Sequence, residues 1–147
     1  QGVQRRMDVH VNIPGLTYID DYAHHPKELA TAISSIRGIF PGRKITAVFQ
    51  PHLYTRTRDF AAEFADALSL VDKLYLLDIY PAREEPIEGV TSDIIFKDVT
   101  APEKYLIKKE ELMGILEQEQ VDVLVTFGAG NIDRFIEPIT EMLKKRI

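Results

Sequence analysis

Acidic, phenolic and imidazole side chains are concentrated in one short segment, Asp-Asp-Tyr-Ala-His-His-Pro, which runs from Asp20 to Pro26. The segment lies where an apolar stretch of strand character gives way to a stretch of helical character. Asp21 can accept hydrogen bonds from ribose hydroxyls, as acidic groups at strand ends do in nucleotide-binding folds. His24 and His25 can donate to a carboxylate or phosphate, or move a proton near neutral pH. The alternative is that Asp20 or Asp21 caps the helix and that the histidines are surface residues.

A second polar segment, Gln-Pro-His-Leu-Tyr-Thr-Arg-Thr, runs from Gln50 to Thr57 at the end of the next apolar stretch. Arg56 lies near the start of a predicted helix, where its planar guanidinium can clamp a carboxylate through two parallel hydrogen bonds. A cation at that place opposes the helix dipole, which favours a role other than helix stability. The alternative is that Thr55 is the N-cap and that Arg56 and Arg58 are solvated.

A third candidate segment, Thr126 to Asn131, follows the last predicted strand and contains Gly128 and Gly130. These glycines permit close approach of a ligand to the backbone, although a glycine turn after a strand is common. The carboxyl ends of parallel strands meet at one edge of a sheet, where ligands bind. We therefore expect the three segments to face one crevice.

Metal binding is an alternative use of these segments, because carboxylates and imidazoles at strand ends ligate divalent ions. The residues of suitable type are Asp20, Asp21, His24, His25, His52 and Asp78. Tyr22 and Ala23 separate the acids from the imidazoles, and the charge of Arg56 would repel a cation, so we predict no metal site. The sequence also has no Gly-Lys-Ser/Thr loop for a triphosphate, so another group would have to hold nucleotide phosphates.

The composition predicts one soluble, cytoplasmic domain. The 147 residues are 45% hydrophobic and 28% charged, which suffices for a sizeable core. The absence of cysteine excludes disulfides, a thiolate nucleophile and a cysteine zinc site. No apolar run approaches the ~20 residues of a membrane span, and the N-terminus lacks a signal-peptide core. A net charge of −5 argues against a nucleic-acid partner.

Hydropathy periodicity predicts strands that alternate with helices. The predicted strands are Val9 to Ile13 and Leu16 to Asp20, which form a hairpin, then Ile45 to Phe49, Leu74 to Leu77, Tyr105 to Ile107 and Val121 to Phe127. The predicted helices are one from Pro26, one with Phe60, Phe64, Leu68 and Val71 on a single face, a short one in Thr91 to Val99, one over Glu111 to Glu119 with Leu112, Ile115 and Leu116 inward, and one over Ile132 to Ile147. Pro138 must either lie near the true start of the last helix or kink it. Tyr80 to Gly89 reads as a surface loop.

This order of elements predicts an α/β domain with a three-layer, Rossmann-like architecture and a mostly parallel sheet that opens with the hairpin. Taken together, the polar segments resemble the C-terminal domain of the bacterial Mur ligases over essentially the whole chain. Asp20 to Pro26 is similar to a family signature that a ligase for muropeptide recycling shares, whereas Gln50 to Thr57 is similar to the pattern of the member that adds L-alanine. Met7 stands where the family usually has Phe.

The resemblance implies a ligase of peptidoglycan precursor synthesis that joins L-alanine to UDP-N-acetylmuramate through an acyl-phosphate, with ATP cleaved to ADP. Such enzymes have three domains, and this chain would be the last one. Residues 1–14 would then be the end of the central domain, a hinge and the first strand, and residues 15–147 the C-terminal domain. The isolated domain is expected to be inactive, and Mg²⁺ to be held mainly by the absent central domain. The alternatives are the muropeptide-recycling ligase, a stand-alone nucleotide or anion-binding module, and a metal phosphoesterase.

The resemblance also assigns roles to individual residues. Asp21 is expected at the ATP ribose and Arg6, at the hinge, at the phosphates. His24, His52 and Arg56 are expected to bind L-alanine, with Tyr22 lining the pocket. His24 is also the catalytic candidate, because it can orient the acyl-phosphate.

Overall fold

Six strands form one sheet in the computed structural model, which describes residues 6–147, and their order is β1-β2-β6-β3-β4-β5. They are β1 (Asp8–Ile13), β2 (Leu16–Asp21), β3 (Ile45–Phe49), β4 (Lys73–Leu76), β5 (Glu103–Leu106) and β6 (Val123–Phe127). The β1–β2 hairpin is antiparallel and every other neighbouring pair is parallel. The predicted mostly parallel sheet with an N-terminal hairpin is therefore confirmed. Gly2 to Arg5, which the resemblance placed in a central domain, lie outside the described residues.

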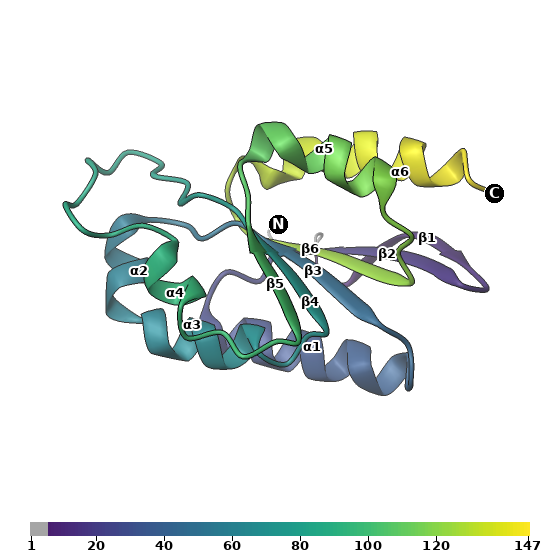
Figure 1. The fold of residues 1–147 in the computed structure, drawn as a ribbon, viewed down its shortest axis with the longest axis horizontal. Coiled ribbons are helices and arrows are strands. Elements are labelled where there is room, and N and C mark those ends of the chain that lie inside the picture. The colour runs from purple at the N-terminus through teal and green to yellow at the C-terminus, as the bar shows by residue number, and fades with distance from the viewer. Residues whose placement is uncertain (1–5) are drawn as a thin grey trace.

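Helices cover both faces of this sheet, so the predicted three layers are confirmed (Figure 1). One face carries α1 (Pro26–Ile39), α2 (Tyr54–Asp59), α3 (Ala61–Leu68) and α4 (Asp93–Phe96). The other face carries α5 (Lys109–Gln118), the short 3-10 helix η2 (Asn131–Phe135) and α6 (Ile136–Lys144). Pro138 is the third residue of α6, where its missing N–H breaks no helical hydrogen bond, so the helix begins just before the proline instead of bending at it. Among the described residues, no helix combines the length and apolar character needed to cross a bilayer.

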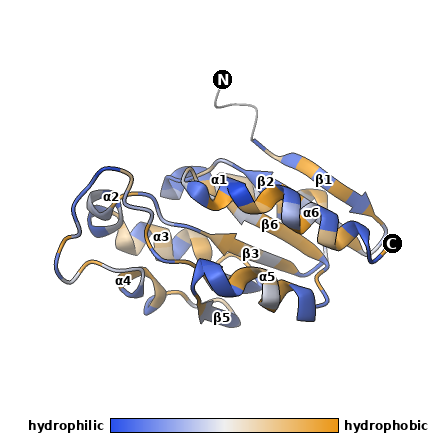
Figure 2. Cartoon of the chain, turned by 90° about the horizontal axis from the view of Figure 1, so that it is seen from above, coloured by the Kyte–Doolittle hydropathy of each residue, from blue (hydrophilic) through white to orange (hydrophobic). Residues whose placement is uncertain are grey.

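Two separate apolar cores explain why the central strands read as continuous apolar runs. Ala47 and Val125 belong to the core beneath α1 and α3, whereas Val48 and Leu124 belong to the core beneath α5 and α6. Successive residues of a strand point to opposite faces, so both faces of β3 and β6 must be apolar. Figure 2 shows the resulting hydrophobic strands beneath helices whose outward faces are hydrophilic.

The helix predicted around Phe60 is wrong in one respect, because two helices stand in its place. α2 ends at Asp59 and α3 begins at Ala61, while Phe60 between them has a non-helical backbone and a 41% exposed side chain. Thr57 is the buried residue of α2, so this short helix packs on the core through Thr57 and not through the predicted face that includes Phe60. Ile115 of α5, expected inward, is only half-buried.

The register of the sheet aligns the ends of the strands that precede the polar segments. Asp21 of β2 lies opposite Phe127 of β6, and Phe127 lies opposite Phe49 of β3. The three polar segments therefore leave the sheet from one row, with the segment after β6 between the other two. The chain after β6 turns toward α6, whereas the chains after β2 and β3 turn toward α1 and α2 on the opposite face (Figure 1).

Gln50 fastens the second polar segment to the third. Its amide Nε2 donates to Asn131 Oδ1 at 2.6 Å, and its Oε1 accepts from the Ile132 N–H at 3.0 Å. Gly130 lies so close that an added Cβ would be 2.6 Å from Gln50 Oε1 and 2.7 Å from the Tyr80 ring. The glycine predicted to admit a ligand thus admits two side chains of the protein itself.

We predict that Gly130→Ala lowers the free energy of unfolding by about 1–3 kcal/mol, because the new methyl group overpacks this contact. Gly114→Ala is the matched control, because a Cβ at this exposed position of α5 has nothing within 4 Å. The control should stabilise the chain by up to about 1 kcal/mol through helix propensity. Urea unfolding of both variants measures the two effects, and a Gly130→Ala variant as stable as the control would contradict the contact.

Candidate functional site

The first two polar segments face each other, as the sequence predicted. The rings of His24 and His52 meet edge to face with centroids 5.9 Å apart, and His25 stacks obliquely on His24 at 4.8 Å. The Tyr22 ring also meets His24 edge to face, with centroids 5.1 Å apart. Three of the chain's four histidines thus form one cluster, which we call the histidine cluster (His24, His25 and His52).

Arg56 joins the histidine cluster from the first turns of α2. Its Nη1 lies 3.2 Å from His52 Nδ1. A guanidinium only donates hydrogen bonds, so Nδ1 must accept, and His52 is a neutral imidazole with its proton on Nε2. The contact orients Arg56 toward the cluster without neutralising its charge, which leaves the guanidinium able to attract a carboxylate.

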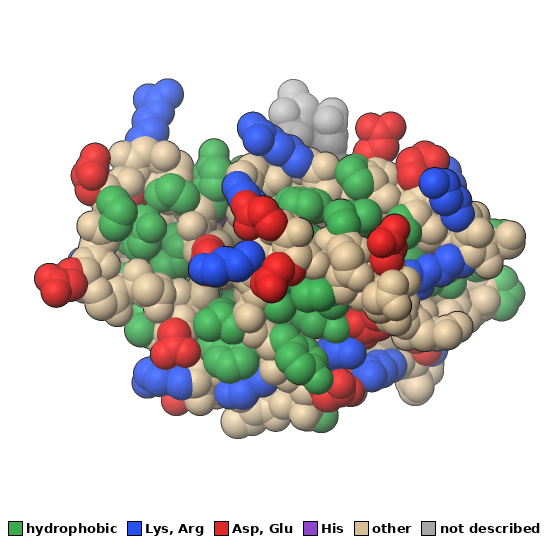
Figure 3. All heavy atoms as spheres, turned by 45° about the horizontal axis from the view of Figure 1, so that its top comes forward, with side chains coloured by type: hydrophobic (Ala, Val, Ile, Leu, Met, Phe, Trp, Pro, Cys, Tyr) green, Lys and Arg blue, Asp and Glu red, His purple; other side chains and the backbone are tan. Residues whose placement is uncertain are grey.

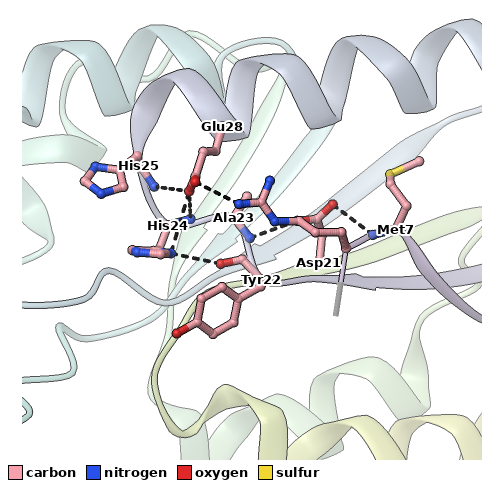
Figure 4. A network of polar contacts seen from close by, with 8 residues as sticks. Met7, Asp21, Tyr22, Ala23, His24, His25 and Glu28 are labelled. Carbon is pink, nitrogen blue, oxygen red and sulfur yellow. Dashed lines mark hydrogen bonds and ion pairs between the residues drawn. The ribbon is translucent and has the colours of Figure 1, made fainter. Parts of the chain in front are cut away.

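His24 is held in a defined tautomer by the backbone. Its Nδ1 lies 3.0 Å from the carbonyl oxygen of Tyr22, which can only accept, so Nδ1 carries the proton and donates. The other nitrogen, Nε2, is then the one that can take up a proton. Figure 4 shows the ring fixed beside the Tyr22 carbonyl at the start of α1.

The environment disfavours the imidazolium forms of His25 and His52. Burial lowers the pKa of His52, and the charges of Arg56 and His24 lower it further, against a smaller opposing effect of Glu84. Burial, Arg56 and His24 likewise lower the pKa of His25. Two members of the cluster, His25 and His52, therefore favour the neutral form beside the fixed cation of Arg56, which can attract a carboxylate.

Glu28, which was not predicted as a site residue, organises the first polar segment. Its Oε1 accepts from the N–H groups of His24 and His25 at 3.1 and 3.2 Å, and its Oε2 accepts from Arg6 at 2.8 Å (Figure 4). Burial raises the pKa of Glu28, but these backbone hydrogen bonds and the charges of His24 and Arg6 outweigh it and lower the pKa overall. The signal was present, since a glutamate three residues after an N-cap is the capping-box pattern.

Because His25 is the N-cap of α1 and Glu28 supplies the capping carboxylate, the alternative that Asp20 or Asp21 caps this helix is wrong. Asp21 instead ties β2 to the start of the described chain. Its Oδ1 accepts from the Ala23 N–H at 2.8 Å and its Oδ2 from the Met7 N–H at 3.1 Å. Burial raises the pKa of Asp21, while those two hydrogen bonds and Arg6 oppose the rise.

Asp21 and Arg6, the two residues expected at ATP, share one cavity. It has a volume of about 400 Å³ and lies beside α1. Lys27, Glu28, Thr31 and Ser35 of α1 contribute to its lining. The two expected nucleotide contacts are thus together, and Glu28 lies between them and the histidine cluster.

The helix in the second segment is capped by another residue that was not predicted. Leu53, not Thr55, is the N-cap of α2, and it offers no polar side chain. Glu84, from the loop after β4, accepts from the N–H groups of Tyr54 and Thr55 at 2.6 and 3.1 Å instead. No local pattern could reveal this cap, because donor and acceptor are about thirty positions apart in the sequence.

No group of three or more His, Asp or Glu side chains within residues 6–147 is arranged to hold a metal ion.

On the face that carries α5 and α6, Figure 3 shows acidic and basic side chains interspersed over the part of the surface that the structure describes. The part of that face drawn in Figure 3 therefore shows no broad cationic patch.

Comparison with known proteins shows one family. The model of the Mur ligase, glutamate ligase domain family matches residues 5–130. The UDP-N-acetylmuramate--L-alanine ligases of Parabacteroides distasonis and Cytophaga hutchinsonii are 57% and 50% identical over 99% of this chain. The chain spans only 32% and 31% of their lengths, about a third of each relative.

Solved structures agree with the sequence relatives. The UDP-N-acetylmuramate-alanine ligase of Thermotoga maritima superposes with a TM-score of 0.76 at 25% identity, covering 97% of this chain and 30% of that one. A domain from a putative UDP-N-acetylmuramate:L-alanyl-gamma-D-glutamyl-meso-diaminopimelate ligase of Haemophilus ducreyi has the same fold, with a TM-score of 0.65 at 20% identity. The match covers 94% of this chain and 99% of that one, so a domain of this size has been solved by itself.

The lowered pKa values of His25 and His52 predict that the fold loses stability in weak acid. As the pH falls through about 6.5, the ordinary histidine pKa, the unfolded chain takes up protons before the folded chain does. The free energy of unfolding should therefore fall between pH 8 and pH 5.5. A His25→Gln/His52→Gln variant should show a flatter dependence than the wild type in urea titrations. An equal slope for the two proteins would contradict this account.

Proposed function

The chain belongs to the Mur ligase family, and on this premise we propose that it is the C-terminal domain of an ATP-dependent ligase that joins L-alanine to UDP-N-acetylmuramate. The reaction would form an amide in peptidoglycan precursor synthesis, in the cytoplasm, by way of an acyl-phosphate. Its partners would be the N-terminal and central domains of the same protein. In this scheme residues 1–14 contain the end of the central domain, the hinge and the first strand, and residues 15–147 form the C-terminal domain.

The observation that carries the proposal is the contact of Arg56 with His52, whose ring packs edge to face on His24, at the carboxyl edge of the sheet. A free amino acid presents a carboxylate and an ammonium group, and it reacts only after the ammonium has lost a proton. Arg56 matches the carboxylate in charge and geometry. His24 Nε2 would take up the proton, and Tyr22 beside it would limit the space for a side chain.

Most of the rate enhancement would then come from placement. Phosphorylation makes the muramyl carboxylate electrophilic, the neutral amine attacks its carbon, and the tetrahedral intermediate collapses with loss of phosphate. Holding the amine against the acyl-phosphate replaces an encounter in solution by an oriented contact. In this scheme His24 is the catalytic residue of the chain, while His52 and Arg56 fix the amino acid.

ATP would be shared with the central domain. The cavity of about 400 Å³ beside α1 combines the carboxylate of Asp21 with the cation of Arg6 and the hydroxyls of Thr31 and Ser35, which suits a ribose and its neighbouring phosphates. Asp21 already accepts two backbone hydrogen bonds, so a ribose hydroxyl would use a remaining lone pair. We assign no Mg²⁺ ligand to the described residues, and the proposal places the ion mainly on the central domain.

A chimera tests the proposal directly. This chain should replace the matching third of the Parabacteroides distasonis ligase, and amide formation should be assayed with ATP, UDP-N-acetylmuramate and L-alanine. We expect turnover by the chimera and none by this chain alone. A chimera that uses only a tripeptide would indicate the muropeptide-recycling ligase. Turnover or phosphate ester hydrolysis by the chain alone would contradict the proposal.

Arg56→Ala in the active chimera should raise the KM for L-alanine about ten- to a hundredfold, because a charged, bidentate contact contributes about 1.5–3 kcal/mol. The KM for ATP should change little. Arg58→Ala is the matched control for loss of the same charge from the same helix, because Arg58 is exposed and its hydrogen bond goes to the neighbouring Asp59 at 2.9 Å. Equal changes in both KM values for Arg56→Ala would reassign the residue.

A further inference from the structure

Beyond the residues that would touch substrate, we propose that Glu84 is the positioning residue of the amino-acid site, which it shapes by capping α2 and thereby aiming Arg56. The inference rests on the proposed function for its kinetic consequence but not for its structural content. Glu84 lies in the loop after β4, far along the chain from the two polar segments that form the site.

The backbone that leads into α2 is held in an unusual conformation. Leu53 has φ 76°, a left-handed conformation that a leucine adopts only under constraint. Two backbone hydrogen bonds hold this turn against the neighbouring loop, from Leu53 N–H to the Tyr80 carbonyl and from Tyr80 N–H to the Pro51 carbonyl, both at 2.8 Å. Residues 51–53 are thus pinned beside Tyr80.

Glu84 caps the first turn of α2. Because Leu53 has no polar side chain, the N–H groups of Tyr54 and Thr55 lack a local cap. Glu84 Oε1 accepts from both, and Glu84 Oε2 accepts from the Thr55 hydroxyl at 2.5 Å. The hydrogen bond from the Thr55 hydroxyl is the main cause that lowers the pKa of Glu84, so the carboxylate is ionised as a cap should be.

The loop that carries Glu84 forms a tight turn. Its backbone N–H donates to the Pro81 carbonyl at 2.9 Å, which closes a tight turn around Ala82. Ala82 has φ 55°, another left-handed residue that is not glycine. Strained backbone on both sides of the Glu84 contacts indicates that the surrounding structure fixes this geometry closely.

The consequence reaches Arg56 because it directly follows Thr55 in the same short helix. Freed from Glu84, the first turn of α2 could fray, and the guanidinium would no longer be held against His52 Nδ1. The amino-acid carboxylate would lose its oriented partner while the cavity shared by Asp21 and Arg6, on a different loop, would remain. Glu84 should therefore influence L-alanine binding selectively.

The test uses the active chimera described above. Glu84→Ala should raise the KM for L-alanine about tenfold, equivalent to about 1.4 kcal/mol, with the KM for ATP nearly unchanged. The KM for L-alanine of Glu84→Gln should fall between those of the wild-type chimera and Glu84→Ala, because the amide oxygen can still accept from the two N–H groups. Glu85→Ala is the matched control, since it removes the same charge from an exposed neighbour in the same loop.

A double-mutant cycle and hydrogen exchange add readouts that a general loss of stability would not produce. Thr55→Val should have little further effect in the Glu84→Ala background, and the amides of Tyr54 and Thr55 should exchange faster in Glu84→Ala but not in Glu85→Ala. An inactive wild-type chimera would overturn the proposed function. The exchange rates of these amides would still test whether Glu84 caps α2. Unchanged exchange, or equal rises in both KM values, would overturn the role of Glu84.

Discussion

The parallel pairing of β2, β6 and β3 is the constraint on which the site depends. Its register places Asp21, Phe127 and Phe49 in one row, so each following segment leaves the sheet at the same level. A shift of one residue in either pairing would turn alternate side chains to the opposite core and move a polar segment out of the row. The two apolar cores thus fix the level at which the histidine cluster forms, although none of their residues takes part in it.

Carboxylates then fix the first two segments after they have left the sheet. Asp21 accepts from Met7, Glu28 from the start of α1, and Glu84 from the start of α2. Met7, Leu53 and Ala82 are the described residues other than glycine with positive φ, and each lies beside one of these carboxylates or, for Ala82, two residues from it. Conformations that cost about 1–3 kcal/mol each are tolerated where ionic hydrogen bonds to the backbone compensate.

The difference between contacts set by strand register and contacts set by individual carboxylates explains how much the sequence could predict. Elements with strong periodicity, such as β3, β6 and α1, were predicted to within two residues, because burial on both faces or on one helical stripe decides them. The meeting of His24 with His52 was also predictable, since it follows from parallel strand ends. The break at Phe60 and the caps by Glu28 and Glu84 were not predicted. The break depends on which face of α2 is buried, and the Glu84 cap joins residues remote in sequence; only Glu28 left a local signal.

The electrostatics of the site depend on this combination of fixed backbone and nearby charge. The chain carries a net charge of −5, yet its strand ends gather Arg56 and three histidines into a small volume. A guanidinium stays charged at physiological pH, and the pKa values of His25 and His52 are lowered by burial and then by this cation. An incoming carboxylate would compensate the guanidinium and remove part of that penalty. The imidazoles would then accept a proton more readily with an anion bound than without one, so occupancy of Arg56 and proton uptake by its neighbours are linked by the same Coulomb interaction.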